Sequence, residues 1–247
     1  MLNDIASICD IHNHILFGVD DGAKNIGQSM RMLDIAYKEG IRTIIITPHF
    51  CRRYFKYSEE KIYRNYIELK EKTAEIYPDI EIYLGCEIYF DSDTEDNLRT
   101  HSLISMAESR YILMEFDVHI LYSSIRNAVI EALQHGYWPI IAHVERYECL
   151  IKDIDKVFEL SEQGAYIQIN ASSVTGDNGR ITKKFVKKLL KYQTVDFVAT
   201  DAHRDNKRMP LIADCASYIA KKYGKAYAKQ LFVDNPDYII KDKCLGE

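Results

Sequence analysis

Strand-like and helix-like segments alternate along almost the whole of this 247-residue chain. The β-branched run at residues 43–48 is typical of a strand that is buried on both faces. Met30, Leu33 and Ala36, just before it, have the spacing of an amphipathic helix. This alternation predicts parallel βα units and therefore an α/β fold. Seven strand segments of this size favour a barrel, although an open doubly wound sheet has the same alternation.

The seven expected strands lie at residues 8–16, 43–48, 80–89, 111–116, 139–144, 165–171 and 196–200. Asn25 or Ser29 is expected to cap the first helix, and Ser58 begins a long charged one. The chain contains no evident linker, repeat or low-complexity tract. We therefore expect residues 1–247 to form a single domain, which is a normal length for an α/β barrel.

The bulk composition excludes several classes of protein. A net charge of −5 argues against a nucleic-acid-binding protein, which usually has a clear basic excess. None of the six cysteines forms a Cys-x-x-Cys pair, so a reduced, cytoplasmic chain is expected rather than a disulfide scaffold. No basic leader precedes an apolar run, and no segment reaches the roughly 20 apolar residues of a membrane span. We expect no membrane insertion.

The first strand contains the sequence Asp-Ile-His-Asn-His at residues 10–14. Side chains two positions apart on a strand share a face, so His12 and His14 can bind one metal ion together. A single His-x-His pair also occurs as two hydrogen-bonded core histidines, and taken alone it does not decide between the two interpretations.

Histidines and carboxylates recur at the ends of the other expected strands. The potential ligands are His12, His14, Asp21, His49, Glu87, Glu115, His143, Asp201 and His203. In a parallel barrel the carboxyl ends of all strands meet at one face, where active sites lie. Burying these groups is costly unless they are paired, and divalent ions would remove that cost. Each acid alone is more often part of a salt bridge, but the whole set predicts a metal centre.

Nine nitrogen and oxygen ligands exceed what one tetrahedral ion needs, so we expect two or three ions. With no thiolate in the set, Mn²⁺, Fe and Zn²⁺ are all compatible with it. One common class of hydrolytic enzymes uses a cysteine nucleophile that is followed six residues later by an arginine. No cysteine of this chain meets that spacing, so a cysteinyl mechanism is disfavoured.

Several motifs together resemble the polymerase and histidinol phosphatase (PHP) domain. They are residues 10–14, Thr-Pro-His at 47–49, Gly-Cys-Glu-Ile-Tyr at 85–89, Ile-Ala-His-Val-Glu-Arg at 141–146 and Thr-Asp-Ala-His at 200–203. Val-Asp-Asp-Gly-Ala at 19–23, His-Val-Glu-Arg-Tyr at 143–147 and Leu-Phe-Val-Asp-Asn-Pro at 231–236 are similar to the bacterial capsule-type tyrosine-protein phosphatases. The resemblance extends from about Cys9 to the C-terminus.

The resemblance implies a distorted seven-stranded (βα)7 barrel of the PHP fold that holds manganese. The implied ligand sets are His12, His14, Glu87 and Asp201; Glu87, Glu115 and His143; and Asp21, His49 and His203. It also implies that Arg146 and Arg208 bind the substrate phosphate. From the chemistry, His49 or His203 is a candidate to assist the leaving oxygen if a ring nitrogen is free.

The implied activity is metal-dependent hydrolysis of phosphotyrosine on the tyrosine-rich tail of an autophosphorylated bacterial kinase that controls capsule or exopolysaccharide synthesis. Two alternatives stay open: a phosphatase for a small ester such as histidinol phosphate, and a non-catalytic metal-binding regulator. A homo-oligomer is compatible with either. Residues 52–56 form a basic, aromatic segment expected at the rim of the site. The lysine-rich helix at 183–188 is expected to be a solvated outer face, and residues 1–7 have no assigned role.

Overall fold

The computed structural model describes residues 7–51, 55 and 57–246, and it leaves residues 1–6, 52–54, 56 and 247 outside that description. Within the described residues every pairing between strands is parallel. The strands are β1 (Ile8–Asp10), β2 (Ile41–Ile46), β3 (His49–Phe50), β4 (Glu81–Leu84), β5 (Glu87–Tyr89), β6 (Tyr111–Glu115), β7 (Trp138–Ile141), β8 (Tyr166–Asn170) and β9 (Phe197–Ala199).

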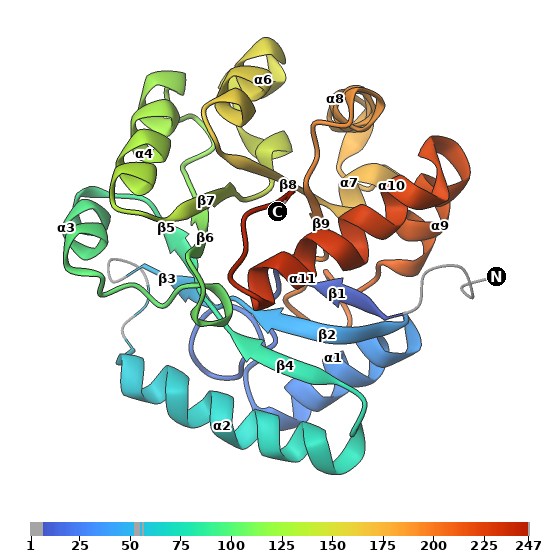
Figure 1. Cartoon of the computed structure of the whole chain (residues 1–247). Coiled ribbons are helices and arrows are strands. Elements are labelled where there is room, and N and C mark those ends of the chain that lie inside the picture. The colour runs from blue at the N-terminus through green and yellow to red at the C-terminus, as the bar shows by residue number, and fades with distance from the viewer. Residues whose placement is uncertain (1–6, 52–54, 56, 247) are drawn as a thin grey trace.

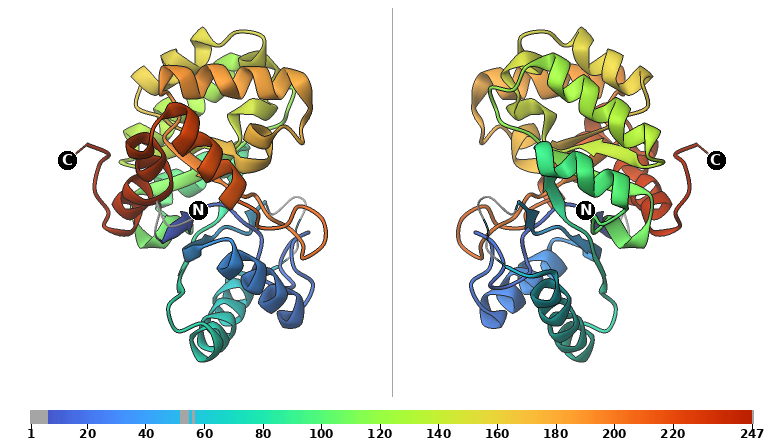
Figure 2. Two further views of the ribbon diagram at one scale, coloured as in Figure 1. Left: turned by 90° about the vertical axis from the view of Figure 1, so that its right-hand side faces the viewer. Right: turned by 90° about the vertical axis from the view of Figure 1, so that its left-hand side faces the viewer.

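Helices surround the strands on the outside (Figure 1). They are α1 (Ile26–Lys38), α2 (Glu59–Ile76), α3 (Ser92–Thr100), α4 (Tyr122–Gln134), α5 (Glu148–Ile151), α6 (Asp155–Glu162), α7 (Ala171–Thr175), α8 (Gly179–Tyr192), α9 (Ala213–Tyr223), α10 (Lys225–Lys229) and α11 (Asn235–Ile240). Short helical turns lie at Met106–Glu108, Val144–Arg146 and Gln230–Asp234. Figure 2 shows α2 and α8 at opposite extremes of the molecule.

The strands form a curled parallel sheet, which confirms the predicted α/β barrel-like class. Three strands pair in the order β1-β2-β4 and six in the order β3-β5-β6-β7-β8-β9. A parallel bridge between Asn13 and Ala202 brings the first strand region beside the last. The carboxyl ends of the strands are thereby gathered at one end of the molecule.

One of the seven expected strands is divided into two segments, and one short strand was not expected. The expected strand at 43–48 corresponds to β2, and the unexpected strand β3 follows Pro48, which has no N–H to donate to a ladder. The one at 80–89 is interrupted at Gly85, whose position would bring a Cβ to 3.1 Å from the Cα of Met106. The seven expected strands therefore correspond to eight observed segments, and β3 is the ninth within the described chain.

The first strand is also shorter than predicted, because β1 ends at Asp10 rather than at residue 16. Beyond it the segment bonds to two neighbours: the Thr47 N–H, just after β2, donates to the Asn13 carbonyl, and the His14 N–H donates to the Ala202 carbonyl. His12 and His14 therefore lie just past the strand, on an extended segment between two neighbours. His143 similarly lies beyond β7, not within the strand as predicted.

The helix starts follow the sequence signals. Of the two predicted caps for α1, Asn25 is the one used, because its side chain accepts a hydrogen bond from the Gln28 N–H. Ser58 caps α2 in the same way, and Glu59 and Glu60 complement the helix dipole. These caps fix where the loops that carry ligands end.

An apolar cluster fills the interior of the curled sheet. It includes Ile11, Ile45, Leu113, Ile140 and Phe197, all buried. Ile239 of α11 belongs to the same cluster, and α11 crosses the end at which the strands begin (Figure 1). The opposite end is left for polar side chains.

Candidate metal centre

The structure brings together all nine residues predicted as metal ligands. Their nitrogen and oxygen atoms form groups within 4.8 Å of one another, namely His14–Asp21–His49–His203, His12–His14–Glu87, His12–His143–Asp201 and His49–Glu87–Glu115. The groups share members, so they make one continuous cluster at the carboxyl ends of the strands. That these residues bind metal ions stays a prediction, but the convergence on which it depends is present.

The most deeply buried part of the cluster contains His12, His14, Glu87 and Asp201. The Nε2 atom of His12 lies 3.2 Å from Glu87 Oε1, and the Nε2 atom of His14 lies 3.3 Å from Glu87 Oε2. Both nitrogens are also 3.6 Å from Asp201 Oδ1. Neither nitrogen has a hydrogen-bond partner among the described residues, although both are fully buried. Two lone pairs and two carboxylates that face one small space fit a divalent cation.

A second part of the cluster is centred on Glu87 and Glu115. His143 Nε2 lies 2.8 Å from Glu87 and 3.5 Å from Glu115. His49 Nδ1 approaches the same two carboxylates, at 3.0 Å and 3.4 Å. His49 therefore borders two parts of the cluster, whereas the resemblance to PHP domains assigned it only to the set with Asp21 and His203.

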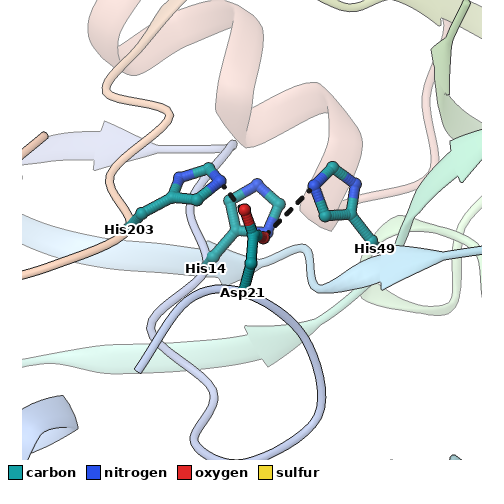
Figure 3. A group of neighbouring side chains, drawn as sticks. All are labelled: His14, Asp21, His49 and His203. Atoms are coloured by element: carbon teal, nitrogen blue, oxygen red, sulfur yellow. Dashed lines mark ion pairs between the residues drawn. The ribbon is translucent and has the colours of Figure 1, made fainter. Parts of the chain in front are cut away.

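Figure 3 shows the third and most open part, where Asp21 stands between His49 and His203. Asp21 Oδ1 is 3.6 Å from His49 Nε2 and 3.5 Å from His203 Nε2. The Asp21 side chain is 54% exposed, in contrast to Glu87 at 1%. This part is therefore the side from which solvent or a substrate can enter.

Neighbouring groups fix which nitrogen of three imidazoles faces the cluster. His14 Nδ1 lies 2.7 Å from Asp20 Oδ2, and His12 Nδ1 lies 3.2 Å from Gln168 Oε1. His203 Nδ1 is 3.0 Å from the backbone carbonyl of Asp201. Each of these acceptors favours a proton on Nδ1, which leaves the Nε2 lone pair for a ligand.

Three residues that support the cluster were not predicted from the sequence: Asp20, Gln168 and Asn170. Gln168 also accepts the His143 N–H at 2.7 Å and donates to Asn170 Oδ1 at 2.9 Å. Asn170 in turn donates to Asp201 Oδ2 at 2.8 Å. Residues 168 and 170 alternate with isoleucines on the expected strand at 165–171, and that pattern would have indicated two polar side chains on one face.

Asp20 was overlooked in favour of its neighbour Asp21. It is buried and accepts N–H groups from Gly22 at 2.8 Å and from His49 at 3.0 Å. The turn closes tightly on the site, because a Cβ at Gly22 would lie 2.1 Å from the carbonyl oxygen of His14. The sequence Asp-Asp-Gly thus places one acid inward and the other at the rim.

Two candidate ligands have left-handed backbone conformations, which non-glycine residues rarely adopt. They are His143, with φ of 33°, and Asp201, with φ of 52°. The Asp201 N–H donates to the His12 carbonyl at 2.8 Å, and Gln168 holds the N–H of His143. Strained backbone that is held by specific bonds is typical of functional sites.

The charges of the cluster shift its pKa values in opposite directions. Burial works against the charged form of Glu87, yet the imidazoles of His12 and His49 hold its pKa well below the usual range. Burial likewise opposes the charge of Asp201, and Arg146 outweighs it and lowers that pKa. Burial also opposes a proton on His49, but the Glu87 carboxylate raises its pKa to about 10.

His203 behaves differently, because burial and the nearby charge of His14 lower its pKa to about 2. Its imidazole is therefore neutral at any physiological pH and offers a lone pair without first losing a proton. This is the state that metal binding requires of histidine.

The two arginines predicted to bind phosphate both contact Asp201. The guanidinium of Arg146 forms a short ion pair with Asp201 Oδ2, and Arg208 Nη2 lies 2.6 Å from the same oxygen. Both arginines are partly exposed and line a cleft of about 670 Å³ beside the cluster. Two guanidinium groups next to candidate metal ions form a site suited to a phosphoryl group.

The rim segment expected at 52–56 lies mostly outside the described residues. Its residue Phe55 is described, and its ring stacks on His49 with centroids 5.2 Å apart and an interplanar angle of 7°. An aromatic side chain therefore stands at the open part of the cluster.

The buried thiols of Cys86 and Cys215 are poorly suited to nucleophilic attack. All six cysteines are free. Burial raises the pKa of Cys86 well above its usual value and also raises that of Cys215. A thiol with a raised pKa is protonated at neutral pH and unreactive. This agrees with the absence of the cysteinyl motif from the sequence.

A curled parallel α/β sheet with histidines and carboxylates at the carboxyl ends of its strands places the chain in the class of α/β proteins with a candidate metal centre. Within that class the chain belongs to the CpsB/CapC family, because the family model described as "Capsular polysaccharide synthesis, CpsB/CapC" matches residues 8–241. The family recognised from the motifs is thereby confirmed.

Individual relatives agree with this assignment. Tyrosine-protein phosphatase CpsB of Streptococcus pneumoniae is 38% identical over 241 residues, which are 96% of this chain and 99% of that protein. A solved structure from a study of YwqE from Bacillus subtilis and CpsB from Streptococcus pneumoniae, described as unique metal-dependent tyrosine phosphatases, superposes with a TM-score of 0.87. The two chains are 29% identical, and the superposition covers 96% of this chain and 95% of the solved chain.

A more distant neighbour supports the fold alone. Histidinol phosphate phosphatase from Lactococcus lactis has a TM-score of 0.59 at 17% identity, covering 89% of this chain and 94% of its own. In the described part of the chain, no helix combines the length and the apolar character that crossing a membrane requires.

Proposed function

We propose that this protein is a metal-dependent phosphotyrosine-protein phosphatase. The observation that carries the proposal is the convergence of nine histidine and carboxylate side chains beside two arginines that share Asp201. Relatives that are similar over nearly the whole chain bear the name tyrosine-protein phosphatase, and a similar solved structure is described as metal-dependent.

The residues that would hold the metals are His12, His14, Asp21, His49, Glu87, Glu115, His143, Asp201 and His203. Their mixture of nitrogen and oxygen atoms fits Mn²⁺, our first choice, and is also compatible with Fe or Zn²⁺. The overlapping groups support two or three ions. Bound divalent ions would supply acidified water at neutral pH and neutralise charge on the phosphoryl oxygens.

Arg146 and Arg208 bind the phosphoryl oxygens in this proposal. Both arginines pair with Asp201 in the structure. With a metal ion bound, Asp201 would be a ligand of that ion, and the planar guanidinium groups would then be free to form paired hydrogen bonds with phosphate. Neither arginine can lose its proton, so both keep their charge at any pH of interest. They orient the substrate and stabilise the charge of the transition state.

A tyrosine leaving group needs little help, since the phenol has a pKa of about 10. His49 and His203 remain the candidates for assisting the leaving oxygen, provided that one ring nitrogen of either is not occupied by a metal ion. The stacked ring of Phe55 is placed to contact the phenol from the open side.

The substrate would be the tyrosine-rich tail of an autophosphorylated bacterial kinase that controls capsule or exopolysaccharide synthesis. This protein would act in the cytoplasm as a single domain spanning residues 1–247. The family description supports a role in capsule synthesis.

The test combines elemental analysis of the native protein with turnover of phosphotyrosyl peptides. We expect manganese to support hydrolysis and chelation to abolish it. Faster hydrolysis of histidinol phosphate than of any phosphotyrosyl peptide would instead indicate a small-ester phosphatase. Tight peptide binding with full metal occupancy and no turnover would indicate a non-catalytic regulator.

A further inference from the structure

A basic groove lies along α8, outside the candidate metal centre. It has a volume of about 490 Å³ and is lined by Arg180, Lys183, Lys184, Lys187, Lys188, Lys191, Lys222 and Tyr223. Residues 179–195 contain no Asp or Glu. The seven cations contribute +7 to a chain of net charge −5, so the rest of the chain carries −12. Such an asymmetry marks a surface for an anionic partner.

The cations of the groove are not neutralised within the described chain. None of the seven takes part in an ion pair with a described acid. Lys183 donates to the carbonyl of Thr175 at 2.5 Å, and Lys222 donates to the hydroxyl of Tyr218 at 3.0 Å. Both acceptors are neutral, so the positive charges remain available to a ligand.

The groove begins where the cleft of the candidate active site ends. That cleft is lined by Thr175, Asp177 and Asn178 as well as by Arg146 and Arg208. Arg180, two residues after Asn178, opens the groove. Lys183 connects the two features, because it lines the groove and bonds to Thr175 of the cleft. A chain leaving the cleft therefore meets the cations of α8 directly.

The shape of the groove suits an extended peptide. From Arg180 to Lys191 the helix rises about 17 Å at 1.5 Å per residue. An extended peptide covers this length with about five residues at roughly 3.3 Å each. The stems of the lysines form its walls, so the backbone of a ligand would contact methylene groups while its carboxylates meet the ammonium groups.

We infer that the α8 groove binds an acidic segment of the phosphoprotein substrate, separated in sequence from the phosphotyrosine that enters the metal centre. This inference rests on the proposed function and adds a substrate class to it. The groove would lower KM for substrates with such a segment and leave kcat unchanged, because its cations touch no reacting atom.

The experiment compares three phosphotyrosyl peptides with the manganese-loaded protein: one with neutral flanks, and two with four glutamates placed six residues before or after the phosphotyrosine. The test variant is Lys184→Glu, Lys188→Glu and Lys191→Glu. The matched control is Arg64→Glu, Lys70→Glu and Lys72→Glu on α2, at the other extreme of the molecule (Figures 1 and 2). All six side chains are exposed, so folding should be unaffected, which circular dichroism checks.

We expect the acidic block on one side to lower KM about tenfold at low salt, in line with a few exposed ion pairs. The gain should disappear at 0.5 M salt and in the α8 variant but persist in the α2 control. All proteins should hydrolyse the neutral peptide with the same kcat. Failure to hydrolyse even that peptide would refute the phosphatase itself, whereas equal KM values for all three peptides would refute only the groove.

Two other occupants are tested with the same variants. Sedimentation with phosphatidylglycerol vesicles that only the α8 variant loses, together with equal KM values, would overturn the peptide proposal in favour of an anionic membrane surface. A dimer that only the α8 variant loses, again with equal KM values, would overturn it in favour of a second copy of this chain.

Discussion

The two ends of the curled sheet use the same strands for opposite purposes. At the carboxyl ends, polar and charged side chains converge on a shared space, with Glu87 and Asp201 fully buried among imidazoles. At the amino ends, aromatic rings pack together across the sheet. The ring centroid of Tyr111 lies 4.9 Å from that of Trp138 and 5.4 Å from that of Tyr166. One end is organised around what it can bind, and the other around excluding water.

The closed end is sealed by the last residues of the chain. Tyr111 donates its hydroxyl proton to the carbonyl of Lys243 at 2.7 Å, and Arg110 forms an ion pair with Asp242 at 3.2 Å. Arg110 also lies 3.8 Å from the ring centre of Trp138. Figure 1 shows α11 and the C-terminal tail across this end. These contacts are satisfied within the chain and need no ligand.

Buried carboxylates at the two ends differ in pKa. Asp196, just before β9 at the closed end, has its pKa raised to about 7 by burial, and its main partner is the Ile167 N–H. Asp201, just after the same strand, is equally buried, yet Arg146 and His12 lower its pKa. Asp196 and Asp201 thus lie at opposite ends of one strand and differ in charge state. Burial favours the protonated form of Asp196, whereas Asp201 stays charged and can bind a cation. Neighbouring charge, not depth, decides the difference.

The comparison predicts the largest effect for His14→Ala at the open end. His14 contributes to two of the four ligand groups, so we expect loss of metal and at least a thousandfold loss of phosphatase activity. Elemental analysis and peptide turnover measure both. The exposed His119→Ala variant is the control and should match the unmodified protein. Full metal content with normal turnover in His14→Ala would remove the open end from the mechanism.

At the closed end, Tyr111→Ala should reduce stability without altering metal content. Removing a fully buried aromatic side chain costs about 3–5 kcal/mol of unfolding free energy. Urea unfolding measures the loss, and Tyr111→Phe isolates the part due to the Lys243 hydrogen bond. Tyr63→Ala, at an exposed position, should be nearly neutral. Metal loss from folded Tyr111→Ala protein would show that the two ends are coupled.

Gln168→Ala should affect the open end by an intermediate amount. The amide holds the His12 ring and the His143 backbone, so its loss should weaken metal affinity about 10–100-fold. Titration with Mn²⁺ followed by calorimetry measures the change independently of activity. Gln168→Glu keeps an acceptor for both contacts and should retain more affinity than alanine. Unaltered affinity in both variants would mean that the ligands are positioned without this residue.

Arg146→Ala should leave metal content intact while weakening phosphate recognition. We expect kcat/KM for a phosphotyrosyl peptide to fall about tenfold, and inhibition by inorganic phosphate to weaken as well. Arg146→Lys keeps the charge but not the planar pair of donors, and it should recover only part of the loss. Kinetics identical to those of the unmodified protein would exclude Arg146 from its proposed role.

The smallest effect is expected from pH at the closed end. The folded pKa of Asp196 is raised to about 7, so its contribution to stability is complete below about pH 4 and is lost as pH rises through 7. Asp196→Asn should therefore gain stability relative to the unmodified protein at pH 8, on the order of 1 kcal/mol or a few degrees in Tm. The gain should be markedly smaller at pH 5, which is close to the unfolded pKa. A gain that is the same at both values would contradict the pKa assignment.

The sequence by itself determined the α/β class, the cap Ser58 and all nine side chains of the cluster, whereas it left both Asn25 and Ser29 open as the cap of α1. These features depend on local rules: periodicity gives the element, and in a parallel sheet each strand delivers its last residues to a common end. The position of a residue just after a predicted strand was enough to place its side chain at the carboxyl end of the sheet.

Only the tertiary structure decided the breaks after β2 and β4, the inward position of Asp20 rather than Asp21, and the amide chain from Gln168 through Asn170 to Asp201. It also decided that α11 closes the other end. These depend on which distant segments come into contact, such as the Asn13 and Ala202 bridge, and on where an unpaired polar atom finds its partner. Spacing along one chain does not contain that information, because it is set by how segments from different parts of the chain pack together.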